Sequence, residues 1–203
     1  VQEGEFVGIM GASGSGKTTL LNCISTIDMV SAGHIYLDGT DVTEINEKQI
    51  ARFRRENLGF VFQDFYLLNS LSVKENIMLP MVLDKAPVDK CYKNVEAYAE
   101  NFGLSHLLEK QPYEVSGGEK QRVAICRALI NNPDLILADE PTGNLDSKSG
   151  KIVIDALKDI NEHMGKTIIM VTHDPQMASY CSRLILLKDG VIPVSYTHLR
   201  AHE

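Results

Sequence analysis

The sequence predicts an α/β fold in which helices cover both faces of a mostly parallel sheet. Apolar runs of strand length alternate along the chain with longer segments whose apolar residues follow a helical period. Residues 134–139 and 167–172 are almost continuously apolar, as expected of parallel strands that are buried on both faces. A glycine-rich loop over residues 11–16 joins the first apolar run to the first helical segment, which is the order of a βα unit.

The composition is that of a soluble globular protein. The chain has 203 residues, enough for one large domain, with 44% hydrophobic and 23% charged residues. No apolar run approaches the length that spans a bilayer, and no signal peptide is visible, although the chain opens on Val1 rather than Met. The net charge of −7 predicts no nucleic-acid partner, because phosphate backbones bind basic surfaces. The four cysteines lack metal-site spacing and are predicted to be reduced thiols.

Residues 1–62 are predicted to form strands around one helix. A short buried strand covers residues 5–10, and the helix follows the glycine-rich loop, where leucines and isoleucines recur at helical spacing. A second strand over 33–39 ends in an Asp-Gly turn, and a third covers 57–62.

The middle of the chain is predicted to be helical and the last third to return to alternating strands and helices. Residues 64–131 contain two amphipathic runs and then a helix that begins after Ser116 and ends near Asn131. The amphipathic runs cover 73–83 and 88–101, and the later elements are a strand at 134–139, a helix at 147–163 and strands at 167–172 and 183–188.

The C-terminal tail fits none of these elements. From Pro193 it reads P-V-S-Y-T-H-L-R-A-H-E, which has the period of neither a helix nor a strand. We therefore expect residues 191–203 to be a non-native tail, produced by read-through of a truncated or misassembled coding sequence.

Residues 11–18 read G-A-S-G-S-G-K-T and match the phosphate-binding loop G-x-x-x-x-G-K-[ST]. Glycines let the backbone N–H groups of such a loop close on phosphate oxygens, and the following helix adds its positive N-terminal end. Lys17 can reach the β- and γ-phosphates, and the Thr18 hydroxyl can bind Mg²⁺. The alternative, a flexible Gly/Ser linker, is disfavoured by the strand before the loop and the helix after it.

A second candidate anion site lies at residues 116–119, which read S-G-G-E. Ser116 and Glu119 have the spacing of a capping box, which alone would explain them as the start of a helix. Two glycines in a first helical turn cost roughly 1 kcal/mol each against alanine. They suit a helix end that a ligand or another backbone must approach closely.

Acids and a histidine end two of the predicted strands. Asp139 closes one strand and is followed by Glu140, while His173 follows the next strand at the same edge of the sheet. Asp139 is placed to hold Mg²⁺ through water, and Glu140 to polarise an attacking water. The alternatives are two solvated acids and a histidine that is satisfied within the core.

Together these motifs resemble the nucleotide-binding subunits of ABC transporters, over essentially residues 1–190. The signature commonly reads L-S-G-G-Q, and here Val115 and Glu119 stand at its two ends. The family's motifs occur here in the family's order: Walker A at 11–18, the Q-loop Gln63, the signature at 116–119, Walker B at 135–139 with Glu140, the D-loop at 144–146 and the switch His173.

The resemblance implies a P-loop NTPase of ABC type, with an antiparallel β region beside the parallel sheet. Residues 1–63 and 132–190 would form the nucleotide-binding core of a single domain, and 64–131 an inserted helical subdomain. Two copies would close head to tail, so that each ATP lies between one P-loop and the signature of the other copy. Hydrolysis would then open the dimer and drive an integral-membrane permease.

The resemblance also assigns the site residues. The catalytic residues would be Lys17, Glu140 and His173. The residues that hold Mg²⁺ would be Thr18, Gln63 and Asp139. The residues expected to contact ATP are Gly11, Ser13, Gly14, Ser15, Gly16, Lys17, Thr18, Thr19, Gln63, Ser116, Gly117, Gly118, Glu119 and Asp146. The family has an adenine-stacking aromatic residue upstream of Walker A. This chain starts only ten residues before Gly11 and has no counterpart, so weaker ATP binding than in a longer parent is expected.

Local sequence narrows the resemblance. Residues 59–64, 75–80 and 139–146 resemble the macrolide-export and lipoprotein-release branch, and 171–175 resemble bacitracin-type peptide-resistance transporters more closely. The implied function is an ATP-hydrolysing subunit that powers antimicrobial-peptide export or resistance, held by its permease on the cytoplasmic face of the plasma membrane. The alternatives are a non-transport regulator of a membrane partner, such as a cell-division or cell-wall complex, and lipoprotein release. Soluble repair or translation ATPases are disfavoured because the chain has neither a coiled-coil insertion nor a second cassette.

Overall fold

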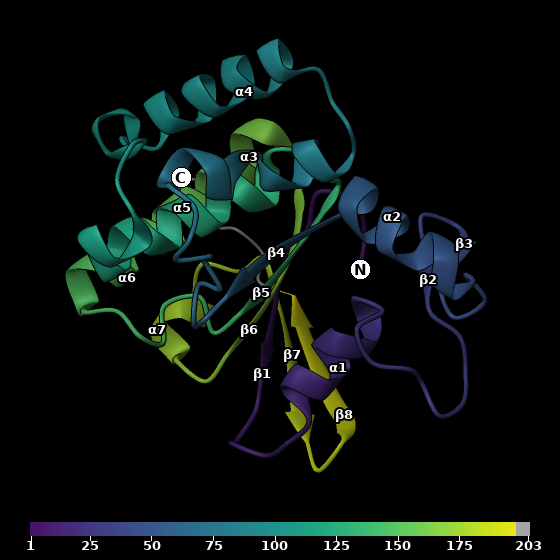
Figure 1. Cartoon of the computed structure of the whole chain (residues 1–203). Helices are drawn as coiled ribbons and strands as arrows, with labels where there is room; N and C mark the ends of the chain where they lie inside the picture. Colours follow the sequence, from purple (N-terminus) through teal and green to yellow (C-terminus); the bar gives the residue numbers. More distant parts are fainter. Residues whose placement is uncertain (198–203) are drawn as a thin grey trace.

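A computed structural model describes residues 1–197 and has a central sheet with helices on both faces (Figure 1). The strand order is β4-β5-β6-β1-β7-β8, and all neighbours are parallel except β7 and β8. The predicted fold class is therefore confirmed. The strands of the sheet are β1 (Phe6–Met10), β4 (Leu58–Phe62), β5 (Leu135–Asp139), β6 (Thr167–Thr172), β7 (Arg183–Lys188) and β8 (Val191–Thr197), and a separate antiparallel pair comprises β2 (Tyr36–Leu37) and β3 (Thr40–Asp41).

At least one helix lies between each two successive parallel strands of the sheet, because parallel strands need a crossover connection. None of the helices within residues 1–197 has the length and apolar character needed to cross a bilayer. The helices are α1 (Lys17–Ile24), α2 (Glu47–Asn57), α3 (Val73–Leu83), α4 (Val88–Asn101), α5 (Gly117–Leu129), α6 (Ser147–Met164) and α7 (Pro175–Ala178), with short 3₁₀ turns at Ser105–Leu107 and Pro112–Glu114.

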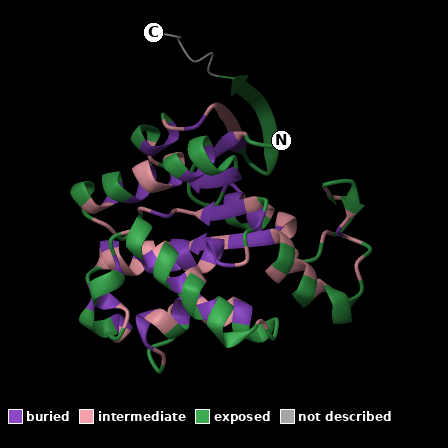
Figure 2. Cartoon of the chain, turned by 90° about the horizontal axis from the view of Figure 1, so that it is seen from above, coloured by how far each residue is buried: buried purple, intermediate pink, exposed green. Residues whose placement is uncertain are grey.

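The core is divided by the sheet into two faces, because successive side chains of a strand point to opposite sides. On β5, Ile136 belongs to the cluster that includes residues of α5 and α6, whereas Leu137 belongs to the cluster that includes α1. On β6, Ile168 and Ile169 divide in the same way. The buried residues accordingly gather in the strands and on the facing sides of the helices (Figure 2).

The helical region has a further core of its own, formed by α3, α4 and α5. Figure 1 shows these helices gathered together, with α4 farthest from the sheet. Helix α5 belongs to both cores: Ile125 and Leu129 pack with the sheet, while Val123 and Cys126 pack with the helical cluster. The helix that carries residues 116–119 is therefore fixed against the sheet.

The prediction of one helix in residues 1–62 was wrong, because α2 is a second helix in this region. It begins after Asn46, whose side chain accepts a hydrogen bond from the Gln49 backbone N–H. No residue of α2 is fully buried, and only Phe53 packs against a core cluster. A helix that buries so little has too few apolar residues to reveal its period.

The prediction that the tail fits no element was wrong as far as Thr197. Residues 191–197 form β8, which pairs antiparallel with β7 after a tight turn at Asp189 and Gly190. Both turn residues have positive φ, 50° and 75°, as two-residue hairpin turns require. Every residue of β8 is exposed, so the strand lacks an apolar pattern, and Pro193 is tolerated because the strand lies at the sheet edge (Figure 2). Residues 198–203 lie outside the described part, and the non-native origin of the tail stays a prediction.

Removal of residues 191–203 is expected to lower the free energy of unfolding by only about 1 kcal/mol or less. The lost strand hydrogen bonds are largely offset by the conformational entropy that the segment regains. The control is Leu187→Ala on β7, a side chain that is 5% exposed. That variant should lose about 2–5 kcal/mol. Urea unfolding measures both, and a truncation as costly as Leu187→Ala would contradict the expectation.

Candidate functional site

The loop between β1 and α1 requires glycine at three positions. Gly14 and Gly16 have φ values of 77° and 96°, a region that other residues rarely adopt. At Gly11 a Cβ atom would collide with the Leu187 carbonyl oxygen and the Ser15 hydroxyl. The loop is therefore held closely against the end of β7, with its backbone turned as a phosphate cradle requires.

Lys17 and Thr18 open α1 at the end of this loop. The Lys17 Nζ donates to the carbonyl oxygens of Gly11 and Ala12, both at 2.9 Å, and its side chain is buried. The Thr18 Oγ1 donates to Oδ1 of Asp139 at 3.3 Å. Burial raises the pKa of the Asp139 carboxyl above its ordinary value, and the Thr18 hydrogen bond opposes this shift. A hydroxyl and a carboxylate thus meet at the end of β5.

Glu140 and His173 come from neighbouring strands, since Asp139 pairs with Val171 in the β5–β6 register. Glu140 has a φ of 45°, and its backbone N–H donates to the Val171 carbonyl at 2.9 Å. Its Oε1 lies 2.8 Å from Nδ1 of His173. Two of the three predicted catalytic residues, Glu140 and His173, are therefore in direct contact.

A cavity of about 580 Å³ brings these segments together. It combines backbone donors of the loop, the Lys17 ammonium and one acid–histidine pair. Gly11, Ser15 and Asp139 are not in its lining. Gly11 closely approaches the Leu187 carbonyl and the Ser15 hydroxyl, and Asp139 accepts the hydrogen bond from Thr18, which does line the cavity. Its lining residues are Ser13, Gly14, Gly16, Lys17, Thr18, Thr19, Glu140 and His173.

Gln63 does not line this cavity, although it was predicted to bind Mg²⁺ there. Its Nε2 donates to Oδ1 of Asn144 at 3.0 Å, and the Asn144 amide donates back to the Gln63 carbonyl and to Asp64. A Cβ atom at Gly143 would lie 2.8 Å from the same Nε2. The side chain is thus held against the loop that follows β5.

Residues 116–119 do not line the cavity of their own chain either. Ser116 and Glu119 form the predicted capping box, with the Ser116 N–H and Oγ 2.7 and 2.8 Å from Oε2 of Glu119. These hydrogen bonds, the backbone one above all, lower the pKa of Glu119. A Cβ atom at Gly118 would lie 3.0 Å from the Cβ of Ser149, and one at Gly117 would lie 3.2 Å from Leu145. Both glycines therefore have a packing reason within the chain.

Asp146, also predicted to contact nucleotide, caps helix α6. Its Oδ1 accepts hydrogen bonds from the backbone N–H groups of Lys148 and Ser149, both at 3.0 Å. The pKa of Asp146 is lowered by its hydrogen bonds from Ser149 and Lys148. It does not line the cavity of its own chain.

From the sequence, no individual role was predicted for two amides that organise the site, Asn144 of the D-loop and Gln121. Asn144 holds Gln63, as described above. Gln121 is fully buried on α5 and donates to backbone carbonyls beside the site. Gln121 could have been recognised from the sequence. It is a polar residue on the same helix face as Gly118, Ile125 and Ala128, and the apolar period predicts that this face is buried.

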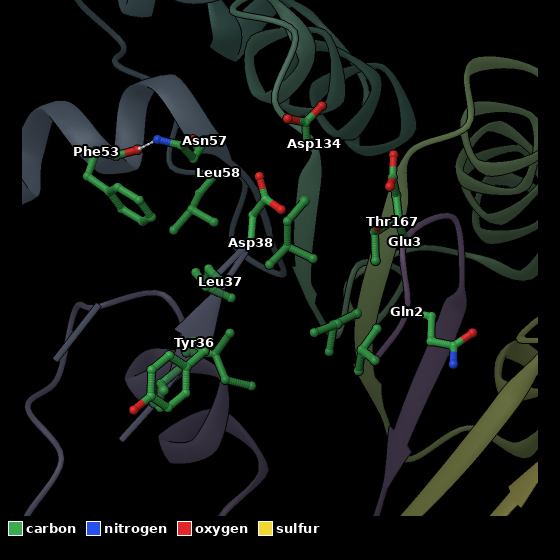
Figure 3. A pocket seen from close by; sticks show the side chains of 15 residues that line it. Gln2, Glu3, Tyr36, Leu37, Asp38, Phe53, Asn57, Leu58, Asp134 and Thr167 are labelled. Carbon is green, nitrogen blue, oxygen red and sulfur yellow. Dashed lines mark hydrogen bonds between the residues drawn. The ribbon is translucent and has the colours of Figure 1, made fainter. Parts of the chain in front are cut away.

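A second cavity, of about 490 Å³, lies at the opposite, amino-terminal ends of the strands (Figure 3). Leu58, Leu135 and Thr167, which begin β4, β5 and β6, line it. Figure 3 shows Phe53 and Leu58 on one side of this cavity and Thr167 on the other. None of the predicted site residues is in its lining. In parallel α/β sheets ligands bind at the carboxyl ends of the strands, where the first cavity lies.

The raised pKa of Asp139 predicts that this carboxylate costs stability. The folded state keeps the proton to a higher pH than the unfolded state, so stability falls as pH rises from 3.8 through the folded pKa. We expect Asp139→Asn to unfold at a higher temperature than the wild type at neutral pH without nucleotide, and the difference to shrink in acid. Thermal unfolding between about pH 4 and 8 measures this.

The matched control is Asp155→Asn, which changes an acid on α6 that is 45% exposed and pairs with the exposed Lys151. It should leave the pH dependence almost unchanged, because exposed ion pairs contribute little. An Asp139→Asn variant that is less stable than the wild type at neutral pH would contradict the assignment.

A phosphate loop lies between β1 and α1, and Asp139, Glu140 and His173 lie beside it at the carboxyl ends of β5 and β6. This arrangement defines a P-loop nucleotide-binding protein. The family described as ABC transporter matches residues 1–143. The chain belongs to this family.

Two curated relatives and one solved structure illustrate the match. The bacitracin export ATP-binding protein BceA of Halalkalibacterium halodurans is 51% identical over 199 residues, which are 98% of this chain and 78% of that protein. The macrolide export ATP-binding/permease protein MacB of Campylobacter jejuni is 50% identical over 95% of this chain and 30% of its own length. The dimeric post-hydrolysis structure of the ATP-binding cassette MJ0796, bound to ADP and Pi, has a TM-score of 0.89. It is 40% identical and covers 100% of this chain and 88% of that one.

Proposed function

We propose that this chain binds ATP with Mg²⁺ and hydrolyses it. The observation that carries the proposal is the single cavity shared by the phosphate loop, Glu140 and His173. The Thr18 hydroxyl and the Asp139 carboxylate suit Mg²⁺, which prefers oxygen ligands. Loop N–H groups and Lys17 suit a polyphosphate. When bound, ATP supplies the phosphoryl group that passes to water.

The residues of the cavity have different roles in phosphoryl transfer. Lys17 and the loop N–H groups neutralise charge on the phosphates, which is where most catalysis of this kind arises. To do so, Lys17 exchanges a hydrogen bond to Gly11 or Ala12 for a phosphate oxygen. Glu140 orients the attacking water and accepts its proton. His173, in contact with Glu140, supports the γ-phosphate side of the site.

A second copy of the chain completes the site in this proposal. Ser116, Gly118 and Asp146 lie outside the cavity of their own chain. Support comes from the solved MJ0796 cassettes, whose structures are dimeric and include one with ADP and Pi. We infer a head-to-tail dimer in which residues 116–119 of each copy meet the nucleotide held by the other.

The dimer is proposed to drive a membrane permease that exports or confers resistance to antimicrobial peptides. The relative named for bacitracin export supports the peptide substrate, and the relative named as a macrolide export ATP-binding/permease protein supports the permease partner. The chain would then act on the cytoplasmic face of the membrane, bound to its permease. Protection of cells from bacitracin, by this gene together with that of its permease, tests the transport step.

The ATPase step is tested by phosphate release from the purified chain. We expect release that depends on Mg²⁺ and rises more than linearly with protein concentration, because two copies form each site. A folded protein that binds ATP and releases no phosphate with Mg²⁺ at any concentration would contradict the proposal.

A further inference from the structure

One buried amide joins the two loops that carry Gln63 and Glu140. Gln121 is 0% exposed, and its Nε2 donates to the Pro141 carbonyl at 2.5 Å and to the Phe62 carbonyl at 3.1 Å. Phe62 ends β4 immediately before Gln63, and Pro141 follows Glu140 directly. A single side chain therefore holds the backbone next to both residues.

The same amide belongs to the helix that carries the signature. Gln121 lies five residues after Ser116, the N-cap of α5, which corresponds to about 7.5 Å along a helix. Helix α5 is fixed to the sheet by Ile125 and Leu129 beyond this point. A displacement of its N-terminal end would therefore be transmitted to the Phe62 and Pro141 carbonyls through about one and a half helical turns and one amide.

Stability alone does not account for this glutamine. Its Oε1 is buried and has no hydrogen-bond partner within the described residues 1–197. A buried acceptor without a partner opposes folding, and a methionine of similar shape would avoid that cost. The two bonds donated by Nε2 are what the amide adds at this position.

We propose that Gln121 is a positioning residue that couples the two nucleotide sites of the dimer. The inference rests on the proposed function, in which the Ser116 end of α5 meets the nucleotide of the other copy. Gln121 meanwhile holds the loops beside Gln63 and Glu140 in its own copy. Nucleotide that draws in the α5 end at one site thereby sets the geometry of the other site.

The test is Gln121→Met in the full chain, with ATP affinity, turnover and the Hill coefficient for ATP measured separately. ATP affinity should stay within about twofold of the wild type, because Gln121 does not line the cavity. Turnover should fall on the order of 10- to 100-fold, the effect of a small misplacement of catalytic groups. We expect a Hill coefficient above one in the wild type, because two copies form each site, and a value of one in Gln121→Met.

Asn161→Leu is the matched control. Asn161 is also a buried amide, 6% exposed, whose Nδ2 donates to two backbone carbonyls, those of Gly4 and Lys166 at 2.9 and 2.8 Å. Unlike Pro141, which directly follows the lining residue Glu140, neither Gly4 nor Lys166 is adjacent in sequence to a residue that lines the cavity. This variant should lower the unfolding temperature and leave turnover and the Hill coefficient unchanged.

The outcomes separate the inference from the proposed function. A wild-type chain without ATPase activity overturns the proposed function itself. With an active wild type, normal turnover and cooperativity in Gln121→Met overturn the coupling, as does an equal loss of turnover in Asn161→Leu. If the Met variant does not fold, Gln121→Asn, which is one methylene too short to hold both carbonyls, is measured with the same criteria.

Discussion

Lys17→Ala is expected to abolish productive ATP binding and, with it, phosphate release. Lys17 is 8% exposed, and its Nζ is held by the loop carbonyls of Gly11 and Ala12 at the edge of the cavity. A charge fixed in a partly dry site acts on phosphate far more strongly than one in water, and losing one such donor lowers turnover on the order of 10²- to 10³-fold. Calorimetric titration with ATP and Mg²⁺ measures the loss of binding, and phosphate release measures the loss of turnover.

A control variant and an unfolding measurement show whether the loss in Lys17→Ala is specific to ATP binding. Lys151→Ala removes an exposed lysine of α6 whose partner is Asp155, and such pairs contribute little, so affinity should not change. Thermal unfolding of Lys17→Ala reports whether the loop survives without its two hydrogen bonds. A folded Lys17→Ala protein with wild-type ATP affinity would contradict the assignment of residues 11–18 as a phosphate-binding loop.

Much of the fold follows from the sequence because burial leaves a readable pattern. The predicted ranges 73–83, 88–101, 167–172 and 183–188 coincide with α3, α4, β6 and β7. Strand β6 is buried at every residue, and the start of α3 is set by a capping box at Ser72 and Glu75. Elements that bury little leave no such pattern, which is why α2 and β8 were missed.

The candidate site was predictable in its local parts only. The phosphate loop and the acids that end β5 are contiguous in sequence, and parallel strands bring their carboxyl ends to one edge. The position of Gln63 depends instead on Asn144, which is 81 residues away, and that of Gln121 on carbonyls of two other segments. Such side-chain contacts are fixed by tertiary packing, which periodicity does not encode.

Gly117 and Gly118 are a second case in which tertiary packing adds a constraint that the sequence does not reveal. From sequence, two glycines at a helix start favour the approach of a ligand. In the structure their lack of a Cβ also lets α5 pack against Leu145 and Ser149. Both constraints apply to one helix end, so substitution at Gly118 would test packing as well as nucleotide contact.

Glu140→Gln is expected to keep ATP bound and to stop hydrolysis. Glutamine has the shape of glutamate, and its amide oxygen can still accept a hydrogen bond from the His173 ring, which lies 2.8 Å from Oε1 in the wild type. It cannot take a proton from water, and general bases contribute on the order of 10²- to 10⁴-fold. We therefore expect turnover to fall by at least 10²-fold while ATP affinity is retained.

Because ATP persists in this variant, the closed dimer should accumulate and elute at twice the monomer mass when ATP and Mg²⁺ are present. Glu109→Gln, a change of an acid that is 80% exposed and pairs with Lys74, serves as the control and should behave as the wild type. Size-exclusion chromatography and phosphate release are measured on the same samples. A Glu140→Gln protein that hydrolyses ATP normally and remains monomeric would show that the base lies elsewhere. His173, the partner of Glu140 in the cavity, would then be the first residue to test.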